Sequence, residues 1–292
     1  MQQSLDRDVT AKWRDRRRRS DELAERWSFA AEVLRFYGKL LAAQEEAYVA
    51  ALEDVPEAAR IAAYAAERVL PRIVELSVAE GPAAMTGGVL ELFDQADCVA
   101  LLAGWLRGDE LAGYERYLAR AAVTPVLEAL AAAGSTLERI GPEDGRHCPR
   151  CGGVPQLGFF AASPEDLVTA HRFLECARCA TSWPFARMTC AGCGELDSAK
   201  LGVFSELGTS QAERSGKLIK SDPANKAVAV EAARFPHVRI DSCGSCAQYL
   251  LTIDLERDAR AVPVVDEIGA LPLDLYAKER GLTKIVPNVM GF

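Results

Sequence analysis

The chain has 292 residues, of which 49% are apolar and 26% charged, and its net charge is −8 at pH 7. This length predicts two domains, or three small ones. No apolar run reaches the roughly 18 residues that a membrane helix requires. The basic run Arg16–Arg19 continues into Ser20 and Asp21 rather than into the apolar core of an export signal. We therefore expect a cytoplasmic protein.

The charge is unevenly distributed along the chain. Residues 1–19 hold seven Lys or Arg against three Asp, a surplus of +4 that leaves −12 for the remainder. We interpret this segment as a basic arm, either solvated or forming the first turns of an exposed helix. An acidic body is a poor match for a nucleic-acid backbone.

Residues 20–143 have the periodicity of helices, and we expect four or five of them with short loops in an antiparallel bundle. Pro71 should kink the helix that follows Pro56, Gly87–Gly88 should separate the next one, and Thr124–Pro125 should begin a short helix ending at Gly134. The first apolar stripe has spacings of three and four: Leu23, Trp27, Ala30, Leu34, Tyr37 and Leu41.

After the turn-rich hinge 141–145 the pattern becomes that of short strands. A helix is expected over Leu271–Arg280, closed by Gly281. The sequence of cysteine pair, strand, connection, strand and cysteine pair occurs twice, which indicates an internal repeat. Strands are expected at 157–160, 172–174, 181–185, 200–204, 238–240 and 249–254, with a turn at 163–166.

These patterns predict an α+β protein in which an all-α helical bundle precedes two tandem rubredoxin-like or zinc-ribbon modules with four cysteines each. The expected segments are a basic arm at 1–19, a helical domain at 20–143, a first metal module at 144–187, a second at 188–265, and a C-terminal helix and tail at 266–292.

Eight of the nine cysteines form four CxxC pairs, which in a reducing compartment point to metal binding rather than disulfides. Cys98 has no partner cysteine, and we interpret it as a small buried apolar residue rather than a reactive thiol. The candidate metal ligands are Cys148, Cys151, Cys176, Cys179, Cys190, Cys193, Cys243 and Cys246.

A CxxC turn, or knuckle, directs two sulfurs at one ion, and two knuckles complete a tetrahedron. Four knuckles can be matched in three ways, and the repeat favours sequential pairing, the first with the second and the third with the fourth. A glycine after the second cysteine permits the left-handed backbone that turns N–H groups towards sulfur. Gly152 and Gly194 hold that position, whereas the other two knuckles have Ala180 and Ala247.

A closed four-thiolate site has no open coordination position, so it does not activate water. Its role is structural, or one-electron transfer if the metal is iron; the sequence does not choose between iron and zinc. We interpret His147, His171 and His237 as surface or strand-packing residues rather than ligands. Asp266, Glu267 and Asp274 are expected to be helix caps and solvated charges. We propose no catalytic residue and do not expect an enzyme.

Two stretches resemble one known family. Residues 173–183, FLECARCATSW, are followed by RMTCAGCG at 187–194, and CGSCAQYL occupies 243–250. This arrangement is similar to that of the FdhE family of formate dehydrogenase accessory proteins, in which a hydrophobic lead-in, CxxC, a tryptophan, an arginine and CxxCG precede a final CxxCxxYL. The connection at 195–242 is longer than the family pattern leads us to expect, and the ending at 285–292 differs.

The resemblance implies a cytoplasmic maturation factor that binds the catalytic subunit of a formate dehydrogenase. It also implies two metal ions, one per four-cysteine site, with rubredoxin-type iron suggested and zinc as the alternative. The eight cysteines carry over to the family's positions, and no catalytic residue does. We assign Trp183 and Arg187 to a partner-facing patch, with packing of Trp183 on the ribbon core as the alternative.

Two other functions remain open. A nucleic-acid-binding zinc-ribbon protein would use clustered basic residues of the long connection. A thiol–disulfide or electron-transfer protein would need a metal-free knuckle with a lowered thiol pKa, or a redox-active metal. The basic residues in question are Lys200, Arg214, Lys217, Lys220 and Lys226.

Overall fold

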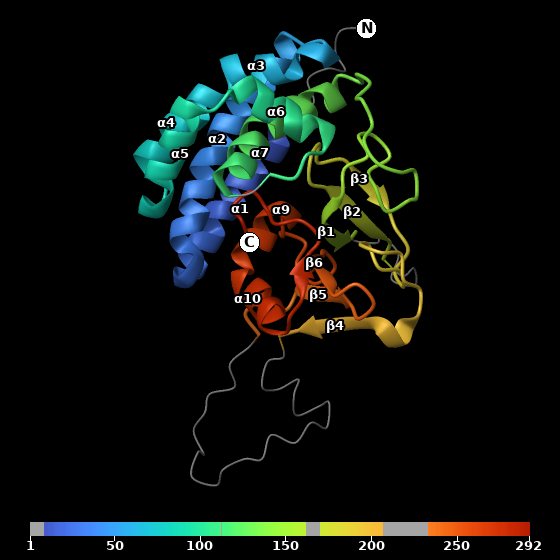
Figure 1. The fold of residues 1–292 in the computed structure, drawn as a ribbon. Helices are drawn as coiled ribbons and strands as arrows, with labels where there is room; N and C mark the ends of the chain where they lie inside the picture. The colour runs from blue at the N-terminus through green and yellow to red at the C-terminus, as the bar shows by residue number, and fades with distance from the viewer. Residues whose placement is uncertain (1–8, 112, 162–169, 207–232) are drawn as a thin grey trace, which may run out of the picture.

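The computed structural model describes residues 9–111, 113–161, 170–206 and 233–292 (Figure 1). The predicted α+β class is confirmed: a helical N-terminal region precedes a sheet that carries two clusters of four cysteines. The expected turn at 163–166 and most of the long connection lie outside the described residues. The helices are α1 (Ala11–Arg26), α2 (Ala31–Glu53), α3 (Ile61–Arg68), α4 (Leu70–Glu80), α5 (Ala83–Gln95), α6 (Cys98–Arg107), α7 (Gly113–Ala132), α9 (Pro263–Gly269) and α10 (Leu271–Glu279).

Of the two alternatives for the basic arm, residues 11–19 follow the helical one, but the helix is packed rather than fully exposed. Residues 11–19 form the first half of α1, and Trp13 is only 1% exposed because it packs against Tyr48, with ring centroids 5.6 Å apart. Arg16 pairs with Glu128 of α7, with Nη1 and Oε1 3.0 Å apart. Arg17 pairs with Glu45 of α2, with Nη2 and Oε2 2.8 Å apart, whereas Arg18 is exposed. Two of the basic residues of this segment therefore join α1 to α2 and α7.

Three helix boundaries differ from expectation. Pro71 lies in the first turn of a separate helix, α4, where its missing N–H costs no hydrogen bond, so the chain breaks there instead of kinking. Gly87–Gly88 lies within α5, where a side chain at Gly88 would come within 2.0 Å of the Tyr114 ring. Helix α7 continues through Pro125.

The sheet has the strand order β3-β2-β1-β6-β5-β4, and the six predicted strands are confirmed to within two or three residues at each end. Neighbouring strands are antiparallel within β1-β2-β3 and within β4-β5-β6, and β1 and β6 join the two triplets in parallel. The bounds are β1 (Pro155–Phe160), β2 (Arg172–Cys176), β3 (Ser182–Pro184), β4 (Leu201–Ser205), β5 (Val238–Cys243), β6 (Gln248–Asp254) and β7 (Thr283–Lys284), which pairs with β6.

This topology explains where the cysteines meet. Each triplet has knuckles before its first strand and between its second and third strands. Because β1 and β6 run in the same direction, the two triplets are related by a shift along one sheet. Both four-cysteine clusters therefore lie at the end of the sheet where β1 and β4 begin. The two repeats therefore share a continuous sheet.

The C-terminal segment packs between the sheet and the helices. The predicted last helix is confirmed as α10, and Gly281 follows it with φ of +73°. Helix α9 was not expected; it contacts α1 on one side and strands β1 and β6 on the other (Figure 1). Within the described residues no helix combines the length and apolarity needed to cross a membrane.

Candidate metal centres

The first centre joins the knuckle before β1 to the knuckle after β2. The Sγ atoms of Cys148 and Cys179 are 3.7 Å apart, and those of Cys151 and Cys176 are 3.5 Å apart. All four sulfurs lie within 4.8 Å of one another, and all four cysteines are buried.

The second centre repeats this arrangement one triplet further along the sheet. The Sγ atoms of Cys190 and Cys246 are 3.8 Å apart, and those of Cys193 and Cys243 are 3.7 Å apart. Cys193 is exposed to solvent, so this centre is open on one side whereas the first is enclosed. The sulfurs are thus grouped as sequential pairing predicts.

The sulfur separations fit a metal ion better than any covalent link. A disulfide requires about 2.05 Å between sulfurs. A tetrahedron with metal–sulfur bonds of about 2.3 Å has sulfur–sulfur edges of about 3.8 Å. The edges of 3.5–3.8 Å are close to that value. Both clusters can therefore hold one tetrahedrally coordinated ion each, and zinc and iron fit equally well.

The knuckle backbone directs N–H groups at the sulfurs. The Cys190 Sγ accepts from the amides of Gly192 at 3.3 Å and Cys193 at 3.4 Å, and the Cys176 Sγ accepts from Arg178 at 3.4 Å. Such bonds stabilise thiolates when a cation is shared among four of them.

The residue after each second cysteine has the left-handed backbone in all four knuckles. The φ values are +70° at Gly152, +51° at Ala180, +82° at Gly194 and +55° at Ala247. The sequence predicted this conformation only for the two glycines. The second knuckles therefore have the same geometry as the first, although alanine rarely adopts it.

The pKa values of two thiols of the first centre are shifted in opposite directions. Hydrogen bonds from the neighbouring thiols, Cys151 first, lower the pKa of Cys148, while burial raises the pKa of Cys176. A bound cation would favour the thiolate form of all four, so metal binding should release protons.

Arginines join the first centre to the helical region. Arg178 donates to the Cys151 carbonyl at 3.1 Å and also to the Leu106 carbonyl of α6. Arg150, inside the first knuckle, donates to the Leu130 carbonyl of α7 at 3.1 Å. The first centre is thus bonded to two helices.

The two residues expected to face a partner differ in exposure. Trp183 is 5% exposed, and its Nε1 donates to the Gly145 carbonyl at 2.9 Å, which corresponds to the alternative of packing on the ribbon. Arg187 is exposed and donates to the Ala170 carbonyl through Nε at 3.0 Å and Nη2 at 2.6 Å. A partner-facing role for either residue stays a prediction.

The histidines lie outside both sulfur clusters. His147 places Nδ1 2.8 Å from the Asp144 carboxylate, and His171 is exposed. His237 is buried and places Nε2 2.8 Å from Asp266 Oδ1.

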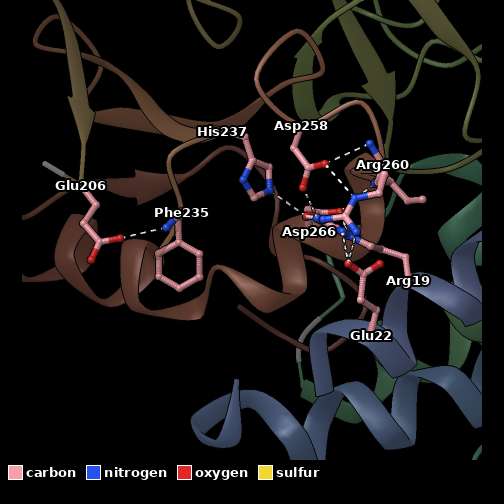
Figure 2. A network of polar contacts seen from close by, with 9 residues as sticks. Arg19, Glu22, Glu206, Phe235, His237, Asp258, Arg260 and Asp266 are labelled. Atoms are coloured by element: carbon pink, nitrogen blue, oxygen red, sulfur yellow. Dashed lines mark hydrogen bonds and ion pairs between the residues drawn. The ribbon is translucent and has the colours of Figure 1, made fainter. Parts of the chain in front are cut away.

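His237, Asp258 and Asp266 form a third group whose donor atoms lie within 4.8 Å of one another, but an arginine already occupies it. Arg19 reaches in from α1 and donates to Asp266 through Nη2 at 2.6 Å and to Asp258 through Nη2 at 2.8 Å (Figure 2). Burial opposes the charge of Arg19, yet the hydrogen bonds to Asp266 raise its pKa. The guanidinium supplies the positive charge that a metal would supply, so this group is an ion network.

The acidic residues of the C-terminal segment are not the solvated charges that the sequence led us to expect. Asp266, Glu267 and Asp274 are fully buried instead of solvated. Asp266 accepts the Val262 amide at 2.7 Å, so its expected capping role is present. Lys284 Nζ lies 2.7 Å from Glu267 and 3.1 Å from Asp274, so one ammonium group pairs with both carboxyl groups. No local pattern indicates these pairs, since only tertiary contacts bring the charges together.

The remaining residues predicted from sequence are placed as follows. Cys98 is half-buried at the start of α6, and burial raises the pKa of its thiol, as expected for an unreactive cysteine. Lys200 pairs with Glu195 at 3.3 Å. The other basic residues named for nucleic-acid binding, Arg214, Lys217, Lys220 and Lys226, lie outside the described residues.

Comparison with known proteins confirms the resemblance to the FdhE family. Residues 222–290 match the family model of the FdhE C-terminal domain. An FdhE homolog of Aquifex aeolicus is 32% identical over 148 residues, which are 50% of this chain and 42% of that protein. One of Pseudomonas aeruginosa is 32% identical over 143 residues, 49% of this chain and 38% of that protein. These matches therefore span less than half the length of either relative.

The likeness in fold is more extensive. The crystal structure of the FdhE protein from Pseudomonas aeruginosa matches with a TM-score of 0.61 at 23% identity, covering 95% of this chain and 94% of that chain. The two chains share a fold from the helical region through the sheet.

Proposed function

We propose that this protein is a cytoplasmic accessory factor that supports maturation of a formate dehydrogenase by binding its catalytic subunit. The observation that carries the proposal is the coincidence of two features: the likeness to FdhE proteins and the two sulfur clusters in one sheet. The resemblance of the cysteine motifs to the FdhE family implies the same role, support of formate dehydrogenase maturation.

The chemistry of the clusters favours a binding protein over an enzyme. Four thiolates fill a tetrahedral ion's coordination, so neither centre offers a position for water or substrate. In our proposal the metal ions hold the knuckles in place. The end of the sheet that carries the knuckles is then rigid, and this end and the helical region present surfaces to another protein.

Co-purification from formate-grown cells tests the proposal. The tagged full-length protein should retain the catalytic subunit of a formate dehydrogenase. A deletion strain should show reduced formate oxidation while still synthesising that subunit. Normal formate oxidation in the deletion strain, with no dehydrogenase co-purifying, would contradict the proposal. Salt-sensitive retention of nucleic acid instead would favour the zinc-ribbon alternative.

Elemental analysis tests the metal assignment separately. Anaerobically purified protein should contain two iron or zinc ions per chain, and its absorption spectrum should distinguish them. Cys148→Ser and Cys190→Ser should each remove one ion, while Cys98→Ser, as the matched control, should retain both. If Cys148→Ser and Cys176→Ser removed different ions, sequential pairing of the ligands would be wrong.

A further inference from the structure

A cavity of about 220 Å³ lies on the sheet beside the second metal centre. Its walls come from the segment before the third knuckle, which carries Arg187 and Met188, and from β4, which carries Val203. Phe160 of β1 and Tyr249 of β6 also line it, so the cavity crosses the join between the two repeats.

Three guanidinium groups line this cavity and only one carboxylate faces them. Asp241 Oδ2 accepts from Arg172 Nη2 at 2.9 Å, and Asp241 Oδ1 lies 2.9 Å from Arg239 Nε. Thr252 donates to Asp241 Oδ2 at 2.7 Å, whereas Oδ1, although close to Arg239, accepts no hydrogen bond within the described residues. The lining therefore includes three guanidinium groups and one carboxylate, together with Cys190, a ligand of the second centre.

The arginines have unused capacity for a negatively charged ligand. Arg172 is 4% exposed, its Nε has no hydrogen-bond partner within the described residues, and burial lowers its pKa. Arg187 donates to a neutral carbonyl, that of Ala170, rather than to a carboxylate in the part of the chain that the structure describes. The guanidinium carbons of Arg187 and Arg239 each lie 4.6 Å from the Phe160 ring centroid, so both contact the same aromatic ring.

The rest of the cavity is apolar and its rim is exposed. Met188 is 58% exposed and Val203 59%. Water occupies about 30 Å³ per molecule in the liquid, so the cavity has room for more than a carboxylate. Its wall β4 is the last strand in the order of the described sheet, the position at which an extended segment of another protein can add. A ligand that covers both Met188 and Val203 must be larger than a free carboxylic acid such as acetate.

We propose that this cavity binds a carboxylate carried next to an apolar side chain on a partner polypeptide, with Arg187 and Arg239 as the anion-binding groups. The fit rests on charge complementarity, since arginine forks match carboxylate geometry. The proposal uses the proposed function only in expecting a protein partner. It can be tested on the purified chain alone, so its failure would leave the co-purification result unaffected.

Isothermal titration calorimetry of the full-length, metal-loaded protein tests this with three probes: the peptide acetyl-Leu-Leu-Glu-Leu-amide, its Gln counterpart, and sodium acetate. We expect the Glu peptide to bind at least tenfold more tightly than the Gln peptide, and acetate to bind more weakly than the Glu peptide. Arg187→Gln should remove the difference between the two peptides; its side chain is exposed, so folding should be retained. Arg72→Gln, an exposed arginine on α4, is the matched control and should preserve the difference.

Three outcomes would overturn the proposal. The first is equal binding of the Glu and Gln peptides, or no binding of either. The second is an Arg187→Gln variant that keeps the preference. The third is acetate binding as tightly as the Glu peptide, which would assign the cavity to a small free acid.

Discussion

The four knuckles impose one backbone conformation on two different residue types. Gly152 and Gly194 adopt positive φ at little cost, but Ala180 and Ala247 have φ of +51° and +55°. A left-handed backbone costs an L-residue about 1–2 kcal/mol. The two alanines are therefore strained positions that the knuckle geometry maintains.

Relieving this strain should stabilise the protein. Ala180→Gly and Ala247→Gly should each raise the free energy of unfolding of the metal-loaded protein by about 0.5–1 kcal/mol, because the relief exceeds the entropy that glycine adds to the unfolded chain. Chemical denaturation gives the values. Ala177→Gly, in the same knuckle as Ala180 but without positive φ, should lower the free energy of unfolding instead. Destabilisation by all three changes would show that the alanines are not strained.

The two knuckle glycines should respond differently to substitution. A Cβ at Gly152 would lie 1.5 Å from the Ile140 carbonyl oxygen, whereas at Gly194 the nearest atom, Cδ of Arg146, is 3.4 Å away. Gly152→Ala should therefore displace the first knuckle and lose one metal ion. Gly194→Ala should retain both ions and lose about 1 kcal/mol of stability from backbone strain. Metal analysis with denaturation checks both, and loss of an ion from Gly194→Ala alone would contradict the steric argument.

At the level of elements, local sequence signals were sufficient to predict those segments whose structure depends on their own residues. The CxxC pairs, the six strands and α10 were predicted because their spacing and turn residues are visible within short windows. The continuation of α7 through Pro125 was not predicted. The carbonyl that Pro125 leaves without a donor is that of Ala121, and Gln44 of α2 donates to it at 3.0 Å. A residue 77 positions away completes the helix, and no local pattern reveals it.

The packing of α1 is likewise not visible in the local sequence. The run Arg16–Arg19 suggests solvent, but Arg19 finds Asp258 and Asp266 239 and 247 residues further along the chain. Of the candidate sites, sequence predicted the eight cysteines and their grouping. It missed the buried ion network, because the partners come from opposite ends of the chain.

The Arg19 network should contribute strongly to the packing of α1 against α9. Arg19→Met leaves Asp266 buried without its main partner, and removing one member of a buried ion pair costs about 3–5 kcal/mol. Arg18→Met is the matched control: its side chain is 77% exposed, so the change should stay within about 0.5 kcal/mol. Denaturation of both variants measures the difference. Adding Asp266→Asn to Arg19→Met should recover part of the loss, and similar stability of the two single variants would refute this account.

At the scale of the whole molecule, the two centres have different surroundings although they are repeats of one plan. The four cysteines of the first centre belong to the same buried apolar cluster as the helical core, which includes Leu118 and Leu127 of α7. The cysteines of the second centre are outside that cluster, and Cys193 is exposed. The first ion should therefore stabilise both regions, and the second mainly its own repeat.

The last prediction tests this difference with one ligand from each centre. Cys176→Ser should lower the melting temperature of the helical signal in circular dichroism at 222 nm, because losing the first ion releases the knuckles that Arg150 and Arg178 bond to α6 and α7. Cys243→Ser should also lose one ion, but the helical signal should melt within a few degrees of the parent protein. Metal analysis must show one remaining ion in each variant, so that the two are compared at equal occupancy. Equal shifts in the helical melting temperature would mean that the two centres stabilise the helical region alike, and the assignment of the first centre as the joint between helices and sheet would be wrong.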